Sequence, residues 1–239
     1  MARTSRRARK ASPLYLPSAF ELFTPSKELV LKNIWIFGPL YATFFIFYIH
    51  SWIWTPKPGQ NVEFWQNAHG FSTAWPGAPL PTYLTFMVVG LSILWFMIIG
   101  FIGTAVQIMS QRAQLDASQG KPLHFRDLFA AVREIGWRML GLYLLSSLAI
   151  IFSLFILARR YLLAPYVMLE NKTGILESMK LSSELSGRNP GAVWGVIGVM
   201  VLIGLVNIVP VIGGLSAFIL GGLYSLAPAI RFQQLKKLT

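Results

Sequence analysis

The 239-residue sequence contains no cysteine, and this absence excludes disulfides, thiolate zinc sites and cysteine nucleophiles. Histidine is scarce as well. His50, His69 and His124 lie in three different segments and show no paired ligand spacing. Because closed metal sites combine several such ligands at short spacings, we expect neither a bound metal ion nor a cofactor.

Acidic side chains are few, with nine aspartates and glutamates in all. Aspartate occurs only at Asp116 and Asp127, and no set of serine, histidine and carboxylate can be assembled from motifs. Neither a phosphate-binding P-loop nor a Rossmann glycine pattern is present. The sequence therefore predicts a protein without catalytic residues that is not an enzyme. An intramembrane enzyme, the least favoured alternative, would depend on Glu170 or His50.

Charged residues make up only 13% of the chain, against about a quarter in soluble proteins, whereas 54% of the chain is apolar. The net charge of +12 comes from basic residues that flank apolar runs. A basic tail precedes the first run and contains Arg3, Arg6, Arg7, Arg9 and Lys10. This placement is typical of topology signals and of contacts with anionic headgroups, rather than of nucleic-acid binding. We expect membrane lipids as partners and no nucleic acid.

Long uncharged stretches predict an all-α, polytopic helical membrane bundle, since a bilayer core needs roughly 20 apolar helical residues per crossing. The last stretch, 189–230, is long enough for two crossings. The sequence NIVPVIGG, from Asn207 to Gly214, supplies the break, because proline ends the hydrogen-bond ladder and glycines permit a turn. The predicted membrane segments are 33–54, 82–109, 139–153, 156–170, 191–209 and 212–230.

Segment 156–170 decides the topology. If it returns through the membrane, there are six segments and both termini lie in the cytoplasm of a multi-pass cell-membrane protein. If it does not, there are five, and the basic carboxyl end lies outside, against the positive-inside tendency. We favour six segments. The chain then divides into a basic cytoplasmic tail with an interfacial segment (1–29), the membrane domain (30–232) and a basic cytoplasmic end (233–239).

Amphipathic helices are predicted outside the membrane segments. Phe125, Leu128, Phe129 and Val132 recur at the spacing of one helical face. Such a helix lies along the inner leaflet and runs into the third segment, or alternatively docks a partner helix. A further cytoplasmic helix is predicted over 174–185.

Arg159 and Arg160 are the candidate binding residues, because charges within a bilayer are costly and often functional. Their guanidinium groups suit a lipid phosphate or another anion. The alternative is that both arginines extend to the outer interface.

Small residues at four-residue intervals predict close helix packing in the last two segments. They are Gly191 and Gly195 in one segment, and Gly213, Ala217 and Gly221 in the other. The same spacing also occurs at self-association faces, so a homodimer is an open alternative.

The stretch from Ala158 to Gly198, ARRYLLAPYVMLENKTGILESMKLSSELSGRNPGAVWGVIG, resembles a signature of small prokaryotic multi-pass proteins. These are related to the membrane domain of some glycerophosphodiester phosphodiesterases. The residues that carry the resemblance are Arg160, Ala164, Pro165, Glu170, Ser178 and Ser182. The resemblance implies a six-segment helical membrane domain of largely uncharacterised role and no catalytic residue.

The leading functional hypothesis is a non-enzymatic integral membrane module that organises lipids or partner proteins, which include another membrane protein or a second copy of the chain. The alternative is a small transporter or channel subunit for an anionic or lipidic substrate. In that alternative, Arg159, Arg160 and Gln107 line the path. Gln107, Asn207 and Ser146 are also candidates for hydrogen bonds between helices.

Overall fold

The computed structural model describes residues 16–54, 82–153, 156–208 and 213–238. Its α-helices are α1 (Phe23–Lys32), α2 (Ile34–Trp54), α4 (Thr82–Ser118), α5 (Phe125–Phe152), α6 (Ala158–Tyr161), α7 (Ala164–Asn171), α8 (Ile175–Arg188), α9 (Pro190–Leu205), α10 (Gly213–Tyr224) and α11 (Ala227–Lys236). A short 3-10 helix, Val206–Ile208, follows α9. No strand occurs within these ranges, so the all-α prediction is confirmed for them.

Two helical stretches are long and apolar enough to cross a membrane. They are α5 and the stretch Gly213–Lys236, which joins α10 and α11. The number rises to four if each of two bent pairs counts as one span: α1 with the start of α2, bent by 101°, and α8 with α9, bent by 103°. Within the described ranges the count is therefore two to four, and the predicted six segments are not confirmed.

Large apolar side chains cover much of the outer surface. On α5, Trp137 is 74% exposed and Phe152 is 84% exposed. Others on α4, α9 and α10 are Leu94, Trp95, Met97, Phe101, Met200, Leu202, Leu205, Leu215 and Ile219. A surface of this kind is unfavourable in water and is the expected outside of a helical bundle in hydrocarbon.

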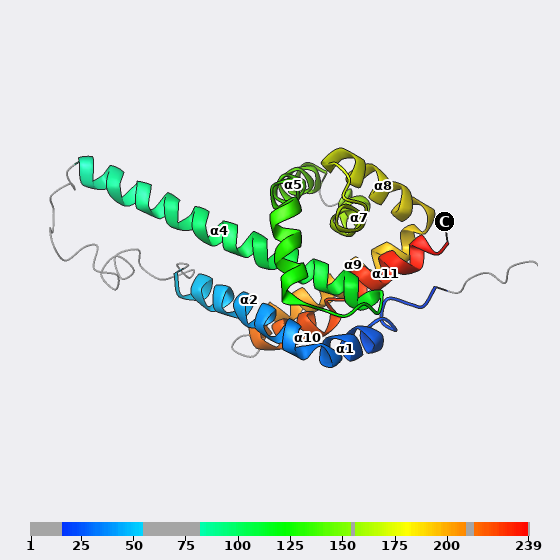
Figure 1. The fold of residues 1–239 in the computed structure, drawn as a ribbon. Coiled ribbons are helices and arrows are strands. Elements are labelled where there is room, and N and C mark those ends of the chain that lie inside the picture. The colour runs from blue at the N-terminus through cyan, green and yellow to red at the C-terminus, as the bar shows by residue number, and fades with distance from the viewer. Residues whose placement is uncertain (1–15, 55–81, 154–155, 209–212, 239) are drawn as a thin grey trace, which may run out of the picture.

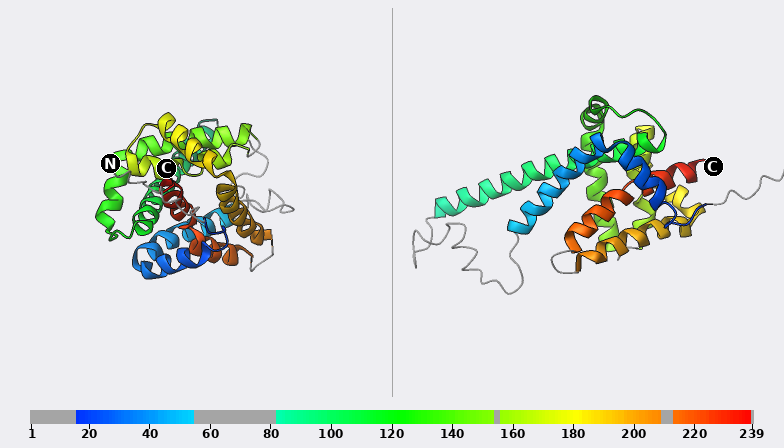
Figure 2. Two further views of the ribbon diagram at one scale, coloured as in Figure 1. Left: turned by 90° about the vertical axis from the view of Figure 1, so that its right-hand side faces the viewer. Right: turned by 90° about the horizontal axis from the view of Figure 1, so that it is seen from below.

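The helices form an elongated arrangement. Helices α2 and α4 run beside each other and reach out beyond the other helices, whereas α5, α7, α8, α9 and α11 gather at the opposite end (Figure 1). The view from below shows the same extension of α2 and α4 (Figure 2). The break predicted between the last two segments is present, because α9 ends at Leu205 and α10 begins at Gly213.

Helix α5 joins two predicted elements in one helix of 28 residues. Its first half is the predicted amphipathic helix, and its second half is the predicted segment 139–153. Leu128 and Ile135 of the first half are buried, whereas Phe129 is 61% exposed. The amphipathic face is therefore only partly covered by the protein itself.

The predicted segment 156–170 is not one helix. It forms the four-residue α6 and the eight-residue α7, separated by a turn at Leu162 and Leu163. Eight helical residues rise only about 12 Å, which is too short to cross a bilayer. From Leu163 to Leu169 every side chain except that of Pro165 is buried. The segment fills the interior of the bundle as two short helices, and its role as a fourth membrane segment is not confirmed.

The chain nevertheless returns to the end where α5 begins. Lys172, just after α7, places its Nζ 2.6 Å from Oε1 of Glu134 near the start of α5. Glu170 lies 2.9 Å from Nζ of Lys236 and accepts a 2.8 Å hydrogen bond from Nε2 of Gln119. The ends of α4, α7 and α11 therefore meet the start of α5 at one charged base.

Helix α8 confirms the helix predicted over 174–185. It turns a stripe of serines inward, and Ser178, Ser182 and Ser186 are fully buried. The Ser182 hydroxyl donates a 2.6 Å hydrogen bond to the carbonyl of Arg160. These side chains are small, and their hydroxyls donate to backbone carbonyls. Helix α8 can therefore pack closely against α6 and α7.

The N-terminal strap, residues 16–22, crosses the last three helices. Arg231 is buried and donates through Nη2 to the carbonyl of Pro17 at 2.8 Å, and Tyr224 donates to the carbonyl of Ala19 at 2.9 Å. A Cβ added to Gly195 would lie 3.0 Å from Cβ of Ala19, so the strap approaches α9 closely at this glycine.

This contact predicts different effects at the two glycines of α9. Gly195→Val overpacks the strap and lowers the free energy of unfolding by about 1–3 kcal/mol. Gly191→Val is the matched control, because a Cβ at Gly191 meets nothing within 4 Å. Thermal unfolding in detergent micelles measures both variants, and equal melting temperatures would contradict the strap contact.

Candidate functional site

The structure places the two candidate arginines near the outside of the bundle. The side chain of Arg160 is exposed and that of Arg159 is half-buried. Both lie on α6, and within the described residues neither side chain has a hydrogen bond or an ion pair with the protein. This geometry leaves the guanidinium groups accessible, and it does not enclose them in a pocket.

A cavity of about 810 Å³ lies between α2, α4, α5, the α6–α7 turn, α9 and α10. The described residues that line it are all uncharged. The apolar wall includes Phe44, Ile150, Ile197, Met200, Val201 and Phe218. The polar wall consists of Tyr41, Gln107, Ser110, Gln111, Gln114, Tyr143, Ser146, Ser147, Tyr161, Tyr166 and Ser225. The cavity is therefore amphipathic, and it includes Gln107 but neither candidate arginine.

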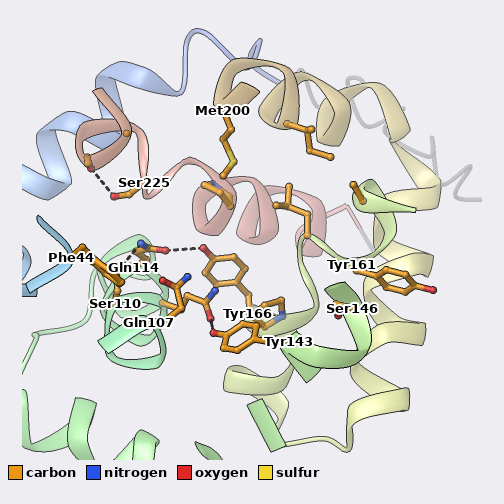
Figure 3. Close-up of a pocket in the computed structure, with 18 of the residues that line it drawn as sticks. Phe44, Gln107, Ser110, Gln114, Tyr143, Ser146, Tyr161, Tyr166, Met200 and Ser225 are labelled. Carbon is orange, nitrogen blue, oxygen red and sulfur yellow. Dashed lines mark hydrogen bonds between the residues drawn. The ribbon is translucent and has the colours of Figure 1, made fainter. Parts of the chain in front are cut away.

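Glutamines and tyrosines build the polar wall as paired side chains. Tyr143 donates a 2.6 Å hydrogen bond to Oε1 of Gln111, and Tyr166 donates a 2.7 Å bond to Oε1 of Gln114. Nε2 of Gln114 donates in turn to the hydroxyl of Ser110 at 3.1 Å. In Figure 3 the rings of Tyr143 and Tyr166 lie beside the glutamines of α4, and Met200 reaches in from α9. These pairs connect α4 with α5 and with the buried α7.

A second polar contact closes the side of the cavity next to α2. The hydroxyls of Tyr41 and Ser225 are hydrogen-bonded to each other, and Ser225 also donates to the carbonyl of Gly222 at 2.7 Å. Gly222 itself faces the ring of Tyr41, since a Cβ there would lie 3.5 Å from Cδ2. The turn between α10 and α11 is thus fixed against α2 by a tyrosine that also lines the cavity.

Charged residues that follow the cavity-lining positions of α4 and α7 in the sequence form ion pairs at the base. Arg112 donates through Nε to Asp116 at 2.8 Å and through Nη1 to the carbonyl of Leu169 at 3.3 Å. Glu170, which an intramembrane enzyme would need, belongs to the same base through Lys236. The side chain of His50 lies outside the described residues. The charged base therefore joins helices, and its groups do not face the cavity.

The predicted packing residues occupy three different environments. Gly191 is exposed, Gly195 meets the strap, and Gly213 and Ala217 are buried. A Cβ at Gly221 would lie 3.9 Å from Cγ2 of Ile203 on α9, and Ala217 and Gly221 both line the cavity. The second series of small residues thus contributes to the cavity. Self-association remains a prediction.

No family model, curated protein or solved structure matches the chain. The resemblance to the membrane domain of glycerophosphodiester phosphodiesterases stays a prediction. Among the described residues, no three histidine or acidic side chains come close enough to hold a metal ion.

The sequence named Gln107 and Ser146 but missed the glutamine and tyrosine pairs. Gln107, Gln111 and Gln114 follow one another at i, i+4 and i+7, which places them on one face of α4. That polar stripe in an otherwise apolar stretch was the available signal. The tyrosine partners Tyr143 and Tyr166 carry no comparable signal, because only the folded chain brings them to this face.

The pair between α4 and α7 predicts a measurable coupling. Gln114→Leu leaves the buried Tyr166 hydroxyl without its acceptor and destabilises the protein by about 1–3 kcal/mol. Adding Tyr166→Phe removes that unsatisfied hydroxyl. The double variant should therefore be destabilised by about 0.5–1.5 kcal/mol less than the sum of the two single variants. Thermal unfolding in micelles of both single variants and the double variant gives the coupling. Thr104→Val, ten residues from Gln114 on α4, is the control and should show no coupling with Tyr166→Phe. Equal coupling energies for the two pairs of variants would refute the contact.

Proposed function

We propose that this chain is a multi-pass membrane protein that holds a lipid in the cavity between its helices and performs no chemistry on it. The observation that carries the proposal is the uncharged cavity of about 810 Å³, bounded by an apolar and a polar wall. Apolar pockets with a few convergent polar groups are the usual sites of small-ligand binding. A lipid is the ligand that a bundle with an apolar outer surface meets at high concentration.

The absence of charge from the cavity lining favours binding over catalysis and over anion transport. General acid–base catalysis most often uses a histidine or a carboxylate at the reacting atom, and an anion path needs cations along it. The cavity lining offers glutamine, serine and tyrosine instead. The transporter alternative required Gln107 together with Arg159 and Arg160, but only Gln107 lines the cavity. We therefore favour a lipid-binding module over a transporter.

The charged base supports a proposal for orientation. It contains Lys172 and Lys236 with their acidic partners, and it adjoins the basic loop after α4 and the basic carboxyl end. Because basic residues concentrate on the cytoplasmic side of membrane proteins, we place this base and both termini in the cytoplasm of a cell-membrane protein. The basic face then meets the anionic headgroups of the inner leaflet.

Filling the cavity tests the lipid-binding proposal. Gly221→Leu adds a side chain at a cavity-lining position where a Cβ makes only an ordinary contact. We expect the purified variant to retain several-fold less co-purified lipid in native mass spectrometry than the original chain. Gly198→Leu on α9 is the control, because Gly198 is exposed and does not line the cavity. Equal lipid retention in the two variants would argue that the cavity is not the binding site.

Cysteine labelling tests the orientation, and the natural absence of cysteine makes the signal clean. Glu184→Cys and Lys237→Cys lie on exposed positions of α8 and the carboxyl end. In intact cells, a membrane-impermeant maleimide should leave both unlabelled and should label Ala68→Cys, which lies in the sequence between the predicted segments 33–54 and 82–109 and is on the outside in the proposed orientation. Labelling of positions 184 and 237 from outside would reverse the orientation of the base.

A further inference from the structure

The polar wall of the cavity has spare hydrogen-bond donors. The hydroxyl oxygen of Ser146 is buried and has no partner within the described residues. Gln111 uses Oε1 to accept from Tyr143, so its amide N–H groups remain for a ligand. Gln107 adds a further amide at the same wall.

Several acceptor oxygens of the same wall are already engaged. Oε1 of Gln111 and Oε1 of Gln114 each accept a tyrosine hydroxyl, and the hydroxyl of Ser110 accepts from Gln114. Ser225 is engaged with Tyr41. What Gln111 still offers a ligand is its amide N–H, which can only donate, so a ligand at this residue must accept hydrogen bonds.

The ligand must also be uncharged where it meets the wall. Among the side chains that the structure describes, no lysine, arginine or histidine lines the cavity. An anionic phosphate placed there would lose its hydration without gaining a counter-charge, which is strongly unfavourable in an apolar environment. A carbonyl oxygen, in contrast, accepts hydrogen bonds from amides and hydroxyls without carrying charge.

We infer that the cavity binds the carbonyl oxygens of a neutral lipid, with Ser146, Gln107 and Gln111 as donors and the apolar wall holding its hydrocarbon. This inference rests on the proposed lipid-binding function and specifies the ligand. Two membrane sources supply this chemistry: the ester carbonyls of glycerides and the ring carbonyls of isoprenoid quinones. The residues that hold the hydrocarbon include Phe44, Ile150, Met200 and Phe218, on four different helices.

Matched lipids test the inference on the full chain in detergent micelles. The probes are dioleoylglycerol, its dioleyl ether analogue without carbonyls, decylubiquinone and dioleoylphosphatidic acid. We expect dioleoylglycerol or decylubiquinone to bind roughly tenfold more tightly than the ether, because one or two neutral hydrogen bonds are lost in the ether. A preference for the glyceride assigns the site to esters, and a preference for the quinone assigns it to ring carbonyls. Either result supports the inference.

Ser146→Ala sharpens the test. It should weaken binding of the preferred carbonyl lipid about three- to tenfold and leave binding of the ether analogue unchanged. Ser147→Ala is the matched control, because Ser147 also lines the cavity but is an exposed residue. Equal losses for the carbonyl lipid and the ether in Ser146→Ala would mean that the serine acts through packing, which overturns its role as a donor.

The outcomes separate the inference from the proposed function. If Gly221→Leu abolishes lipid retention but ester and ether bind equally well, the cavity holds lipid and the carbonyl inference is wrong. Tighter binding of phosphatidic acid than of every neutral probe also overturns the inference. If no probe binds and Gly221→Leu changes nothing, the proposed function itself fails.

Discussion

The enclosure of α7 is the constraint on which the rest of the bundle depends. Eight residues are too few to form a stable helix in isolation, so α7 exists because α4, α5, α8 and α11 surround it. Its Tyr166 stacks with Phe232 at 6.1 Å between ring centroids and hydrogen-bonds Gln114. An unsatisfied hydroxyl at this depth would be costly, and this fixes the positions of α4 and α7 relative to each other.

Charged, uncharged polar and apolar side chains occupy three different zones of the bundle. Ion pairs such as Glu170 with Lys236 occupy the base, uncharged amides and hydroxyls occupy the cavity, and apolar side chains occupy the outer surface. This order follows the energetic cost of desolvation, which is greatest for charges and smaller for amides. Charge gathers where the ends of α4, α7 and α11 meet α5, and the cavity carries groups that a neutral ligand can satisfy.

Hydrophobic length was sufficient to predict several helices from the sequence. The segment predicted at 33–54 corresponds to α2, Ile34–Trp54, and the one at 82–109 forms most of α4. The proline and glycines between Asn207 and Gly214 predicted the break before α10. Length and hydropathy indicate whether a stretch can span a membrane, but they do not indicate which residues surround it in the fold. Segment 156–170 was therefore predicted as a spanning helix, although its apolar residues pack inside the protein.

The same limit applies to the arginines. Arg231 reads as a flanking basic residue at the end of a span, yet it is buried and hydrogen-bonded to Gln234 and to the carbonyl of Pro17. Arg159 and Arg160 are half-buried and exposed, and the choice between a headgroup site and extension to the outer interface stays a prediction. The position of a charge in the sequence does not reveal the carbonyls that the fold brings to it.

The N-terminal strap has a consequence for biosynthesis. Its contacts with Tyr224 and Arg231 join residues that are 205 and 214 positions apart in the chain. The strap therefore emerges from the ribosome about 200 residues before its partners. Since such distant contacts form only when both partners are present, the strap must wait unpacked while the intervening helices are synthesised. Its docking is then a late folding step, which follows the synthesis of α10 and α11.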